Sequence, residues 1–445
     1  MAIYDGGSGD DSWTGTSDAD QANGHDGGDS LSGLGGEDTL DGGAGDDTLD
    51  GGDGNDLLVA GTGLDRLIGG SGNDRLYFGA AFGGSDLAGG GDGTDTLILQ
   101  GNYVALLLAA ANLTGVEGVS LQSGSVTRWG QAGTASYDFA VSAANDLLAA
   151  GQQLRLNAQS LLAGEDFAFD GSAETDGGRF LVYGGFGTDD FVGGSGNDIF
   201  FFEAARFGQL DSVSGGGGND AVVISGAPSG SHYLSLTIKS GALDGIEALS
   251  FNGRFASDPA ARPLYFVTLE NGNIAANGTL IVNASSLDSS QLLSFDGSQS
   301  LQGRMRIFGG AGDDTFYSGL GSDVLQGGGG RDELTGGEGA DIFQYVSLSD
   351  SAGADIDVIF DFEVDRDRID LAQIDADSTL DGDQAFVFLE KGAFTRASGQ
   401  LRYQYDFEKG HFVIEADVDG DGGADFQIHL INGVGMELIA ADFVL

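Results

Sequence analysis

The chain has 445 residues, of which 81 are glycine, and it carries a formal net charge of −51 with only 18 Lys and Arg residues. Such acidity excludes nucleic acid as a partner, because binding to phosphates requires a basic face. The 28 Phe and 11 Tyr residues argue against a disordered acidic chain, and the absence of cysteine excludes disulfide bonds.

The N-terminus has neither the basic region nor the apolar region of a Sec signal. The longest apolar run, residues 103–113, is too short to span a bilayer as a helix. We therefore expect no transmembrane segment, and we expect any export signal to lie elsewhere in the chain.

From Gly6 onward the sequence advances in steps of nine residues. Residues 6–77 form eight consecutive nonapeptides close to the pattern GGxGxDxUx, in which U is apolar, and residues 90–98 form a ninth. Further copies occupy residues 184–201, 215–223 and 309–344. A short fixed period is typical of a β-solenoid. We predict that the first six residues of each copy form a turn and the last three a short strand, because the glycines permit a positive φ.

The apolar positions predict an internal ladder. It contains Leu31, Leu40, Leu49, Leu58, Leu67 and Leu76, with Trp13 and Ala22 as a less regular beginning. Two nonapeptides complete one coil, so turns on the same side are 18 residues apart in sequence. In space they are expected roughly 4.8 Å apart.

This stacking predicts two columns of aspartates from the sixth positions. One contains Asp11, Asp29, Asp47 and Asp65, and the other contains Asp20, Asp38, Asp56 and Asp74. Adjacent carboxylates repel each other by roughly 1 kcal/mol in water and by more when partly buried. A hard dication with oxygen ligands reverses this repulsion, and calcium fits better than magnesium, which dehydrates reluctantly.

The same argument makes candidate calcium ligands of the sixth-position aspartates in the later copies, Asp95, Asp189, Asp198, Asp220, Asp314, Asp323, Asp332 and Asp341. Zinc is not expected, because His25 is the only histidine or cysteine near these turns, and we interpret it as a solvated turn residue. The copies around Asp11 and Asp20 depart most from the pattern.

These nonapeptides resemble the RTX repeats of secreted proteins. The resemblance implies an all-β fold, a parallel β-roll or β-helix solenoid whose GGxGxD turns bind multiple calcium ions. Because the ligand cage does not exist in the unfolded chain, we expect folding to require calcium at roughly the millimolar concentration found outside cells.

A second, longer period of about 125 residues relates the segments between the repeats. Residues 113–121 resemble 243–251, residues 154–158 resemble 280–284, and residues 169–172 resemble 295–298. We therefore predict a repeat block at 1–98, a β-rich spacer at 99–183, a second block at 184–223, a second spacer at 224–308, a third block at 309–344 and a C-terminal region at 345–445. The spacers either continue the solenoid or form small β-sandwiches.

The C-terminal region resembles that of serralysin-type secreted metalloproteases, with Asp355-Ile-Asp-Val-Ile-Phe-Asp-Phe362 near its start and Asp442-Phe-Val-Leu445 at its end. The resemblance implies an uncleaved signal for type I secretion. Within this region, Asp417, Asp419, Asp421 and Asp425 are spaced like an EF-hand loop, although position twelve is Ile428 rather than glutamate. Either a further calcium site or a tight β-turn accounts for this run.

Motifs of catalysis are missing from the sequence. The His-Glu-x-x-His motif of serralysin-type proteases is absent, and the four histidines, His25, His232, His411 and His429, are expected to be isolated from one another. There is also no G-x-S-x-G or P-loop sequence. We expect that the chain is not an enzyme.

The expected function is that of a secreted, calcium-dependent structural protein that assembles with itself into a matrix fibre or surface layer, as the similar alphaproteobacterial RTX surface-layer proteins do. The alternatives are a non-catalytic export and folding module of a larger secreted enzyme or toxin, and a calcium-dependent adhesin or carbohydrate-binding module. The expected partners are further copies of the chain, the type I secretion machinery and an extracellular polysaccharide, at the cell surface or in the medium.

Overall fold

The computed structural model describes residues 1–128, 135–208, 210–226, 233–253, 264–431 and 436–445. Within these ranges the chain consists of β-strands and turns with two short 3₁₀ helices, η1 (Leu348–Asp350) and η2 (Ala440–Asp442). It divides into two compact units: unit 1 comprises Met1–Phe202 and Arg206–Ala221, and unit 2 comprises Glu203–Ala205 and Val222–Leu445. Strand β22 (Ala221–Ser225) crosses the boundary between them.

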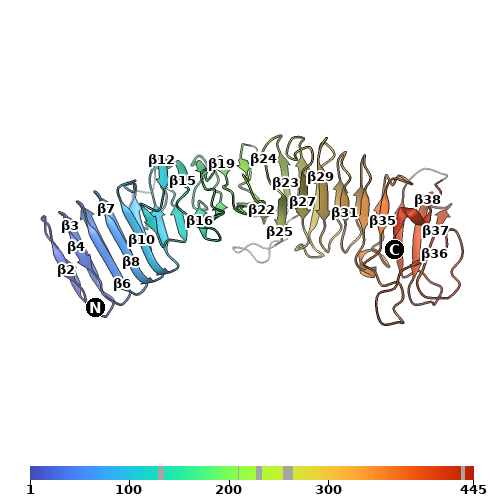
Figure 1. The fold of residues 1–445 in the computed structure, drawn as a ribbon, viewed down its shortest axis with the longest axis horizontal. Coiled ribbons are helices and arrows are strands. Elements are labelled where there is room, and N and C mark those ends of the chain that lie inside the picture. Colours follow the sequence, from blue (N-terminus) through green and yellow to red (C-terminus); the bar gives the residue numbers. More distant parts are fainter. Residues whose placement is uncertain (129–134, 209, 227–232, 254–263, 432–435) are drawn as a thin grey trace. The chain divides into compact units, whose positions relative to one another are not determined.

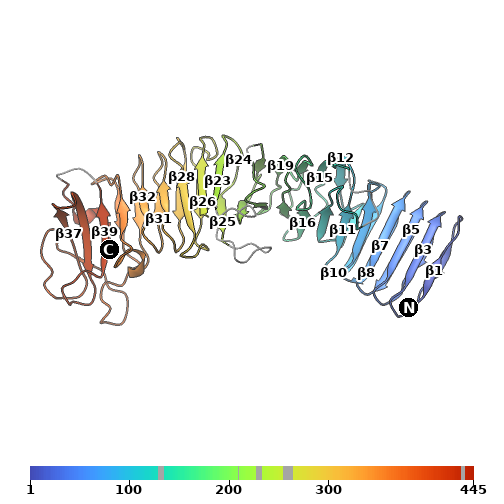
Figure 2. The same ribbon diagram turned by 180° about the vertical axis from the view of Figure 1, so that it is seen from behind.

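Unit 1 is a parallel β-solenoid whose successive strands lie side by side as rungs (Figures 1 and 2). Its long sheet runs, in order of pairing, through β1 (Ile3–Asp5), β3 (Gln21–Asp26), β5 (Thr39–Ala44), β7 (Leu57–Thr62), β9 (Arg75–Gly79), β11 (Thr96–Leu99), β14 (Gly118–Leu121), β16 (Gln153–Asn157), β18 (Arg179–Tyr183) and β20 (Ile199–Glu203). All of these pairs are parallel.

Two shorter parallel sheets form further sides of the same unit. The first contains β2 (Ser12–Thr14), β4 (Ser30–Ser32), β6 (Thr48–Asp53), β8 (Arg66–Gly72), β10 (Leu87–Gly93) and β13 (Leu113–Thr114). The second contains β12 (Tyr103–Leu108), β15 (Phe139–Ala143), β17 (Phe167–Asp170), β19 (Asp189–Val192) and β21 (Ser212–Ser214).

The predicted leucine ladder forms the core of the first repeat block. Leu31, Leu40, Leu49, Leu58, Leu67 and Leu76 are each at most 1 % exposed. Burial of each such side chain contributes roughly 1.5–3 kcal/mol. Beyond the first block, phenylalanines such as Phe167, Phe191 and Phe200 replace the leucines, and they are also fully buried.

The strands of the first block are longer than the sequence predicts. The strands β5, β6 and β7 each have six residues, because the first three residues of the next nonapeptide extend the pairing. The turn backbones also pair, for example Gly43 with Gly61. In the third block the strands have the predicted three residues, as in β30 (Thr315–Tyr317).

The first spacer continues the solenoid and does not form a separate sandwich. Its strand β14 pairs with β11 of the first repeat block, and β16 and β18 follow in parallel. The prediction of an all-β parallel solenoid is therefore confirmed, and the alternative that the spacers form sandwiches is wrong for this segment.

Unit 2 repeats this arrangement. One parallel sheet contains β25 (Ala248–Asn252), β27 (Thr279–Asn283), β29 (Arg304–Phe308), β31 (Val324–Gln326), β33 (Ile342–Gln344), β35 (Arg368–Asp370) and β40 (Phe443–Val444). The other contains β23 (Tyr233–Ile238), β26 (Leu264–Leu269), β28 (Leu292–Asp296), β30, β32 (Glu333–Thr335) and β34 (Asp357–Ile359), and a short strand, β24 (Leu243–Asp244), follows β23.

The second sheet of unit 2 ends in an antiparallel ribbon. Strand β39 (Phe426–Leu430) pairs in parallel with β34 and in antiparallel with β38 (His411–Asp417). Strand β37 (Gln400–Asp406) pairs with β38, and β36 (Val387–Phe388) pairs with β37.

The long sequence period appears as equivalent turns in the two units. Asp170 in unit 1 accepts a hydrogen bond from the backbone N–H of Ser172 over 3.0 Å. Asp296 in unit 2 accepts the same bond from Ser298, also over 3.0 Å. Each turn follows a buried phenylalanine, so the matching residues have the same structural role.

Candidate metal centres

Two columns of carboxylates follow the turns of unit 1. In each column the backbone N–H of one aspartate donates to Oδ1 of the aspartate 18 residues later, as Asp38 does to Asp56 over 2.7 Å. The other links of this kind join Asp11 to Asp29, Asp29 to Asp47, Asp47 to Asp65, Asp20 to Asp38, and Asp56 to Asp74. The structure therefore brings together the residues that the repeat period groups.

The second oxygen of most of these carboxylates has no partner, whereas in Asp11 and Asp20 it accepts from the backbone N–H groups of Gly7 and Thr16. Oδ2 is buried without a hydrogen bond in Asp29, Asp38, Asp47, Asp56, Asp65, Asp74 and Asp95. Removing an ionised oxygen from water without compensation costs several kcal/mol. A buried carboxylate oxygen that lacks a hydrogen bond in coil after coil marks a position at which a cation would stabilise the fold.

Backbone carbonyl groups of the turns complete the donor set. A Cβ placed on Gly51 would contact Oδ2 of Asp56 and would lie 2.6 Å from the carbonyl oxygen of Gly69 in the next coil. Because glycine has no Cβ, the carboxylate of Asp56 and the carbonyl oxygen of Gly69 can approach the same point. An all-oxygen set on a flexible turn fits calcium, which would be held by the Oδ2 atoms and these carbonyl groups and would neutralise the columns.

Five further carboxylates extend the columns, although the sequence reasoning missed them. In unit 1 they are Asp86, Glu117 and Asp211, which accept from the N–H groups of Asp65, Asp95 and Asp189 over 2.8–2.9 Å. In unit 2 they are Asp357 and Asp367, which accept from Asp332 and Asp341.

A weaker sequence signal marks these extra residues. Each of the four aspartates begins an Asp-x-U half-motif without the complete GGxGx run before it, and the apolar residues Ala88, Val213, Ile359 and Ile369 are at most 1 % exposed. The carboxylate and the inward side chain of the repeat thus persist where its glycine pattern is incomplete.

The last copy of the first block and the later blocks show the same links. Asp74 donates to Asp95 and Asp198 to Asp220 over 2.7 Å. In unit 2, Asp314 donates to Asp332 and Asp323 to Asp341, both over 2.8 Å. Calcium binding by these aspartates stays a prediction.

The protein environment disfavours ionisation of these groups. Burial, followed by repulsion from Asp211, raises the pKa of Asp189 to about 8. Burial also raises the pKa of Asp341 to about 8 and that of Asp56 to about 6, with smaller opposing effects from backbone hydrogen bonds. Without a cation, burial therefore favours the protonated form of Asp189 and Asp341 near neutral pH.

This pattern predicts a reversed pH dependence for the calcium-free chain. The folded-state pKa values of Asp189 and Asp341 lie above the ordinary value of 3.8, so the folded chain binds more protons than the unfolded chain between about pH 4 and 8. Folding in calcium-stripped buffer should be favoured at pH 5 and lost as the pH rises towards 8, measured by circular dichroism. A β-signal that grows with pH would contradict this.

Replacement of a turn glycine should disrupt one centre. In Gly51→Ala the new methyl group would collide with the carbonyl of Gly69, and we expect a loss of about 3 kcal/mol in the unfolding free energy of the calcium-loaded chain. Gly84→Ala is the matched control, because a Cβ at Gly84 meets nothing within 4 Å. Equal stability of the two variants in urea titrations would argue against convergent ligands at Gly51.

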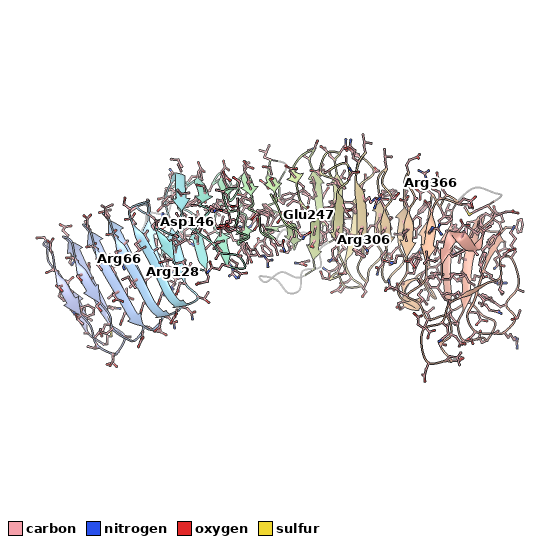
Figure 3. All side chains as sticks on the ribbon, in the orientation of Figure 1. Arg66, Arg128, Asp146, Glu247, Arg306 and Arg366 are labelled. Carbon is pink, nitrogen blue, oxygen red and sulfur yellow. The ribbon has the colours of Figure 1, made fainter. Side chains whose placement is uncertain are left out.

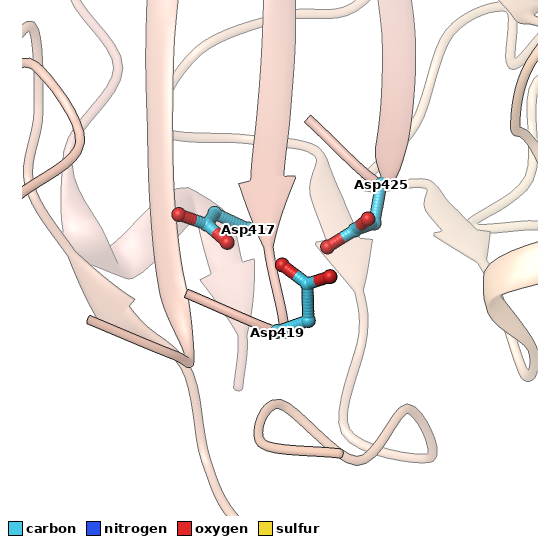
Figure 4. A group of neighbouring side chains, drawn as sticks. All are labelled: Asp417, Asp419 and Asp425. Atoms are coloured by element: carbon cyan, nitrogen blue, oxygen red, sulfur yellow. The ribbon is translucent and has the colours of Figure 1, made fainter. Parts of the chain in front are cut away.

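A separate acidic group lies in the turn between β38 and β39 (Figure 4). Carboxylate oxygens of Asp417, Asp419 and Asp425 lie within 4.8 Å of one another. Asp417 also accepts from the backbone N–H of Gly420 over 2.7 Å. Asp421 lies outside this group, and its Oδ1 accepts from Gly423 over 2.6 Å. The run therefore forms a turn between strands, and a further calcium ion at Asp417 and Asp419 stays a prediction.

The prediction that the histidines are isolated from one another is wrong for two of them. The rings of His411 and His429 lie 4.4 Å apart on the paired strands β38 and β39. The sequence does not reveal this contact, because it depends on the register of the hairpin. His25 is an exposed residue near the end of β3, with Nε2 2.6 Å from Oδ1 of Asp5, and His232 falls outside the described residues.

In the described ranges, the chain has no helix of sufficient length and apolarity to cross a membrane. No curated protein matches the sequence. The model of the family described as Peptidase M10 serralysin C terminal matches residues 6–445. That family is the non-catalytic, calcium-binding repeat region of secreted serralysin-type proteases. Because the match spans both units and all the carboxylate columns from Asp11 onward, the chain belongs to the serralysin C-terminal family of Peptidase M10.

Proposed function

We propose that this chain is a secreted, non-catalytic structural protein that folds on calcium binding and assembles with copies of itself outside the cell into a matrix fibre or surface layer. The orphaned carboxylate oxygens carry the calcium part of the proposal. The same carboxylates account for the buried acidic groups of the repeats, so they do not require a catalytic explanation.

The edge of unit 1 supports assembly. Among the described residues, β1 pairs only with β3, and β2 pairs only with β4. Ile3 on β1 is 74 % exposed. An unpaired strand edge offers backbone donors and acceptors to another chain. A head-to-tail contact of this kind generates filaments or sheets unless its rotation closes a ring.

Export by a type I secretion system is part of the proposal. The terminal segment Asp442-Phe-Val-Leu445 resembles the ending of serralysin-type secretion signals. In the structure, Phe443–Val444 pairs with β35, and Asp442 accepts from the N–H of Asp365 over 3.0 Å. The segment therefore becomes part of the folded solenoid, in which Asp442 and Phe443 are buried, and these two side chains are accessible for recognition before folding.

A row of side chains on the long sheet favours a second candidate, a polysaccharide-binding adhesin. Tyr183 and Phe201 stack with ring centroids 4.4 Å apart, and the guanidinium of Arg155 lies 5.8 Å from the Tyr183 ring. Aromatic rings beside a cation suit an acidic sugar chain, because they offer stacking and charge together. Retention of the chain on an acidic polysaccharide column, abolished by Tyr183→Ala, would favour this candidate.

Electron microscopy and analytical ultracentrifugation of the purified chain test assembly. Millimolar calcium should produce filaments or sheets, and calcium removal should disperse them. The backbone of β1 bonds to β3 through the carbonyl group of Ala2 and the N–H group of Gly6, so the N–H of Ile3 faces the free edge. The substitution Ile3→Pro removes this N–H group. We expect this variant to fold with calcium but not to assemble.

Ile3→Val is the control, since it keeps the N–H group and the strand propensity of β1. It should assemble as the unmodified chain does. Monodisperse monomers of the unmodified chain at millimolar calcium would defeat the assembly proposal, while leaving the calcium-dependent fold intact.

A further inference from the structure

A cavity in the C-terminal part of unit 2 is built on three neighbouring strands. Strands β34, β39 and β38 lie side by side, with Val358 opposite His429 in the parallel pair. The cavity has a volume of about 520 Å³ and is lined by residues in these strands or directly before and after them, by Arg331 and by Lys409 from the turn before β38. None of its lining residues belongs to the carboxylate columns.

The charge of this cavity is opposite to that of the chain. Although acidic residues outnumber Lys and Arg by 69 to 18, all four ionisable or titratable lining residues are basic: Arg331, Lys409, His411 and His429. Other cations of the C-terminal region are paired, as Lys391 is with Glu437 and Arg402 with Glu415. Arg331 and Lys409, in contrast, form no ion pair with any residue that the structure describes.

His411 supplies an independent sign that a ligand is missing. Its side chain is 6 % exposed, and its Nε2 is buried without a hydrogen-bond partner. The His429 ring lies 4.4 Å away but does not hydrogen-bond to it. A buried ring nitrogen without a partner is costly, and an acceptor or donor from a ligand would relieve that cost after a small rotation of the ring.

The remaining lining is apolar. Val358 is buried at the base of the cavity, while Phe360 and Ile431 are about two-fifths exposed at 41 % and 40 %. Basic groups beside an apolar wall match a small molecule with an anionic group on a less polar body, as is usual for ligand pockets with a few polar anchors.

A transition metal is the competing occupant, because two imidazoles on adjacent strands are potential ligands. The lining contains no carboxylate, and the chain contains no cysteine to complete such a site. Arg331 and Lys409 would also repel a cation. The same two charges attract an anion.

We propose that this cavity is a binding site for an organic oxyanion, held by Arg331, Lys409 and the His411–His429 pair against the apolar wall. The site is separate from the calcium columns, and the inference does not depend on self-assembly. Its ligand class is a carboxylate or sulfate ester on a sugar-sized body.

The electrostatics of His429 support this assignment. Burial, followed by the positive charges of His411, Lys409 and Arg331, lowers the pKa of His429 to about 4, while Asp406 acts weakly in the opposite direction. An anion among these groups would favour the imidazolium form and would raise the pKa of His429. The histidine signals therefore report occupancy directly.

Isothermal titration of the calcium-loaded full chain with glucuronate tests the proposal, with glucose as the neutral match and sodium sulfate as the inorganic anion. We expect saturable glucuronate binding, weaker sulfate binding and no glucose binding. In Arg331→Gln/Lys409→Gln the affinity for glucuronate should fall by about tenfold or more. In NMR titrations of the unmodified chain, glucuronate should raise the pKa of His429.

Arg66→Gln/Arg306→Gln is the control for the loss of two positive charges. Arg66 of β8 and Arg306 of β29 are exposed residues outside the cavity (Figure 3), and their replacement should leave binding unchanged. Circular dichroism with calcium checks that each variant folds. Undiminished binding in the double variant would show that glucuronate binds elsewhere on the calcium-loaded chain, and this result would overturn the proposal. Equal binding of glucose, or tight Zn²⁺ binding lost in His411→Phe without any anion binding, would also overturn it.

Discussion

Removal of calcium from the purified chain is expected to abolish most of its β-structure, and millimolar calcium is expected to restore it. Without the ion, the orphaned Oδ2 atoms of the columns remain buried and unpaired in a chain of net charge −51. The free energy of ion binding is therefore folding free energy. Circular dichroism during a calcium titration should show a cooperative transition with a midpoint of roughly 0.1–1 mM, as in extracellular calcium modules.

Magnesium provides the control for ionic strength and charge. It demands a more regular geometry and dehydrates reluctantly, so equal concentrations should restore little structure. Full β-structure in excess chelator at pH 7.5 would contradict the role that we assign to the columns.

The substitution Asp56→Asn is expected to change stability in opposite directions with and without calcium. Asp56 is fully buried in mid-column, with Oδ1 accepting from Asp38 and Oδ2 unpaired. An amide preserves the acceptor but lacks the charge. The calcium-loaded chain should lose about 3 kcal/mol, in line with the removal of one partner from a buried charge pair.

In calcium-stripped buffer the same variant should be more folded than the unmodified chain at pH 7.5, because burial of an ionised carboxylate is no longer required. Asp53→Asn is the matched control, since Asp53 is an exposed residue of the same repeat. Urea unfolding of both variants in each buffer measures the effect. Destabilisation of Asp56→Asn in both buffers would contradict this explanation, because the amide keeps the acceptor for the Asp38 N–H and removes only the charge.

Much of the fold could be predicted from the sequence because the repeat has a strict period. The spacing of Asp38, Asp56 and Asp74 alone implies their contact, and the spacing of Leu40 and Leu58 implies the ladder. In a solenoid each coil contacts only the coils next to it, so residues that are neighbours in space are about one coil apart in sequence.

Prediction was less complete where the coil length varies. Asp86 follows a shortened turn, and Glu117 replaces aspartate after an insertion, so neither fits the nine-residue frame. His411 and His429 meet through an antiparallel hairpin, whose register depends on side-chain packing across β38 and β39. Contacts of this kind follow no repeat and leave no periodic trace in the sequence.

The hydrogen bonds along the columns have a mechanical consequence. The columns of Asp47 and Asp56 are offset by half a coil and share one ladder of leucines. If the hydrogen bond between two successive coils breaks in one column, the hydrogen bonds of the other column still connect the same coils. Under tension outside the cell, such a solenoid should fail gradually, coil by coil, and should re-form from the coils that remain.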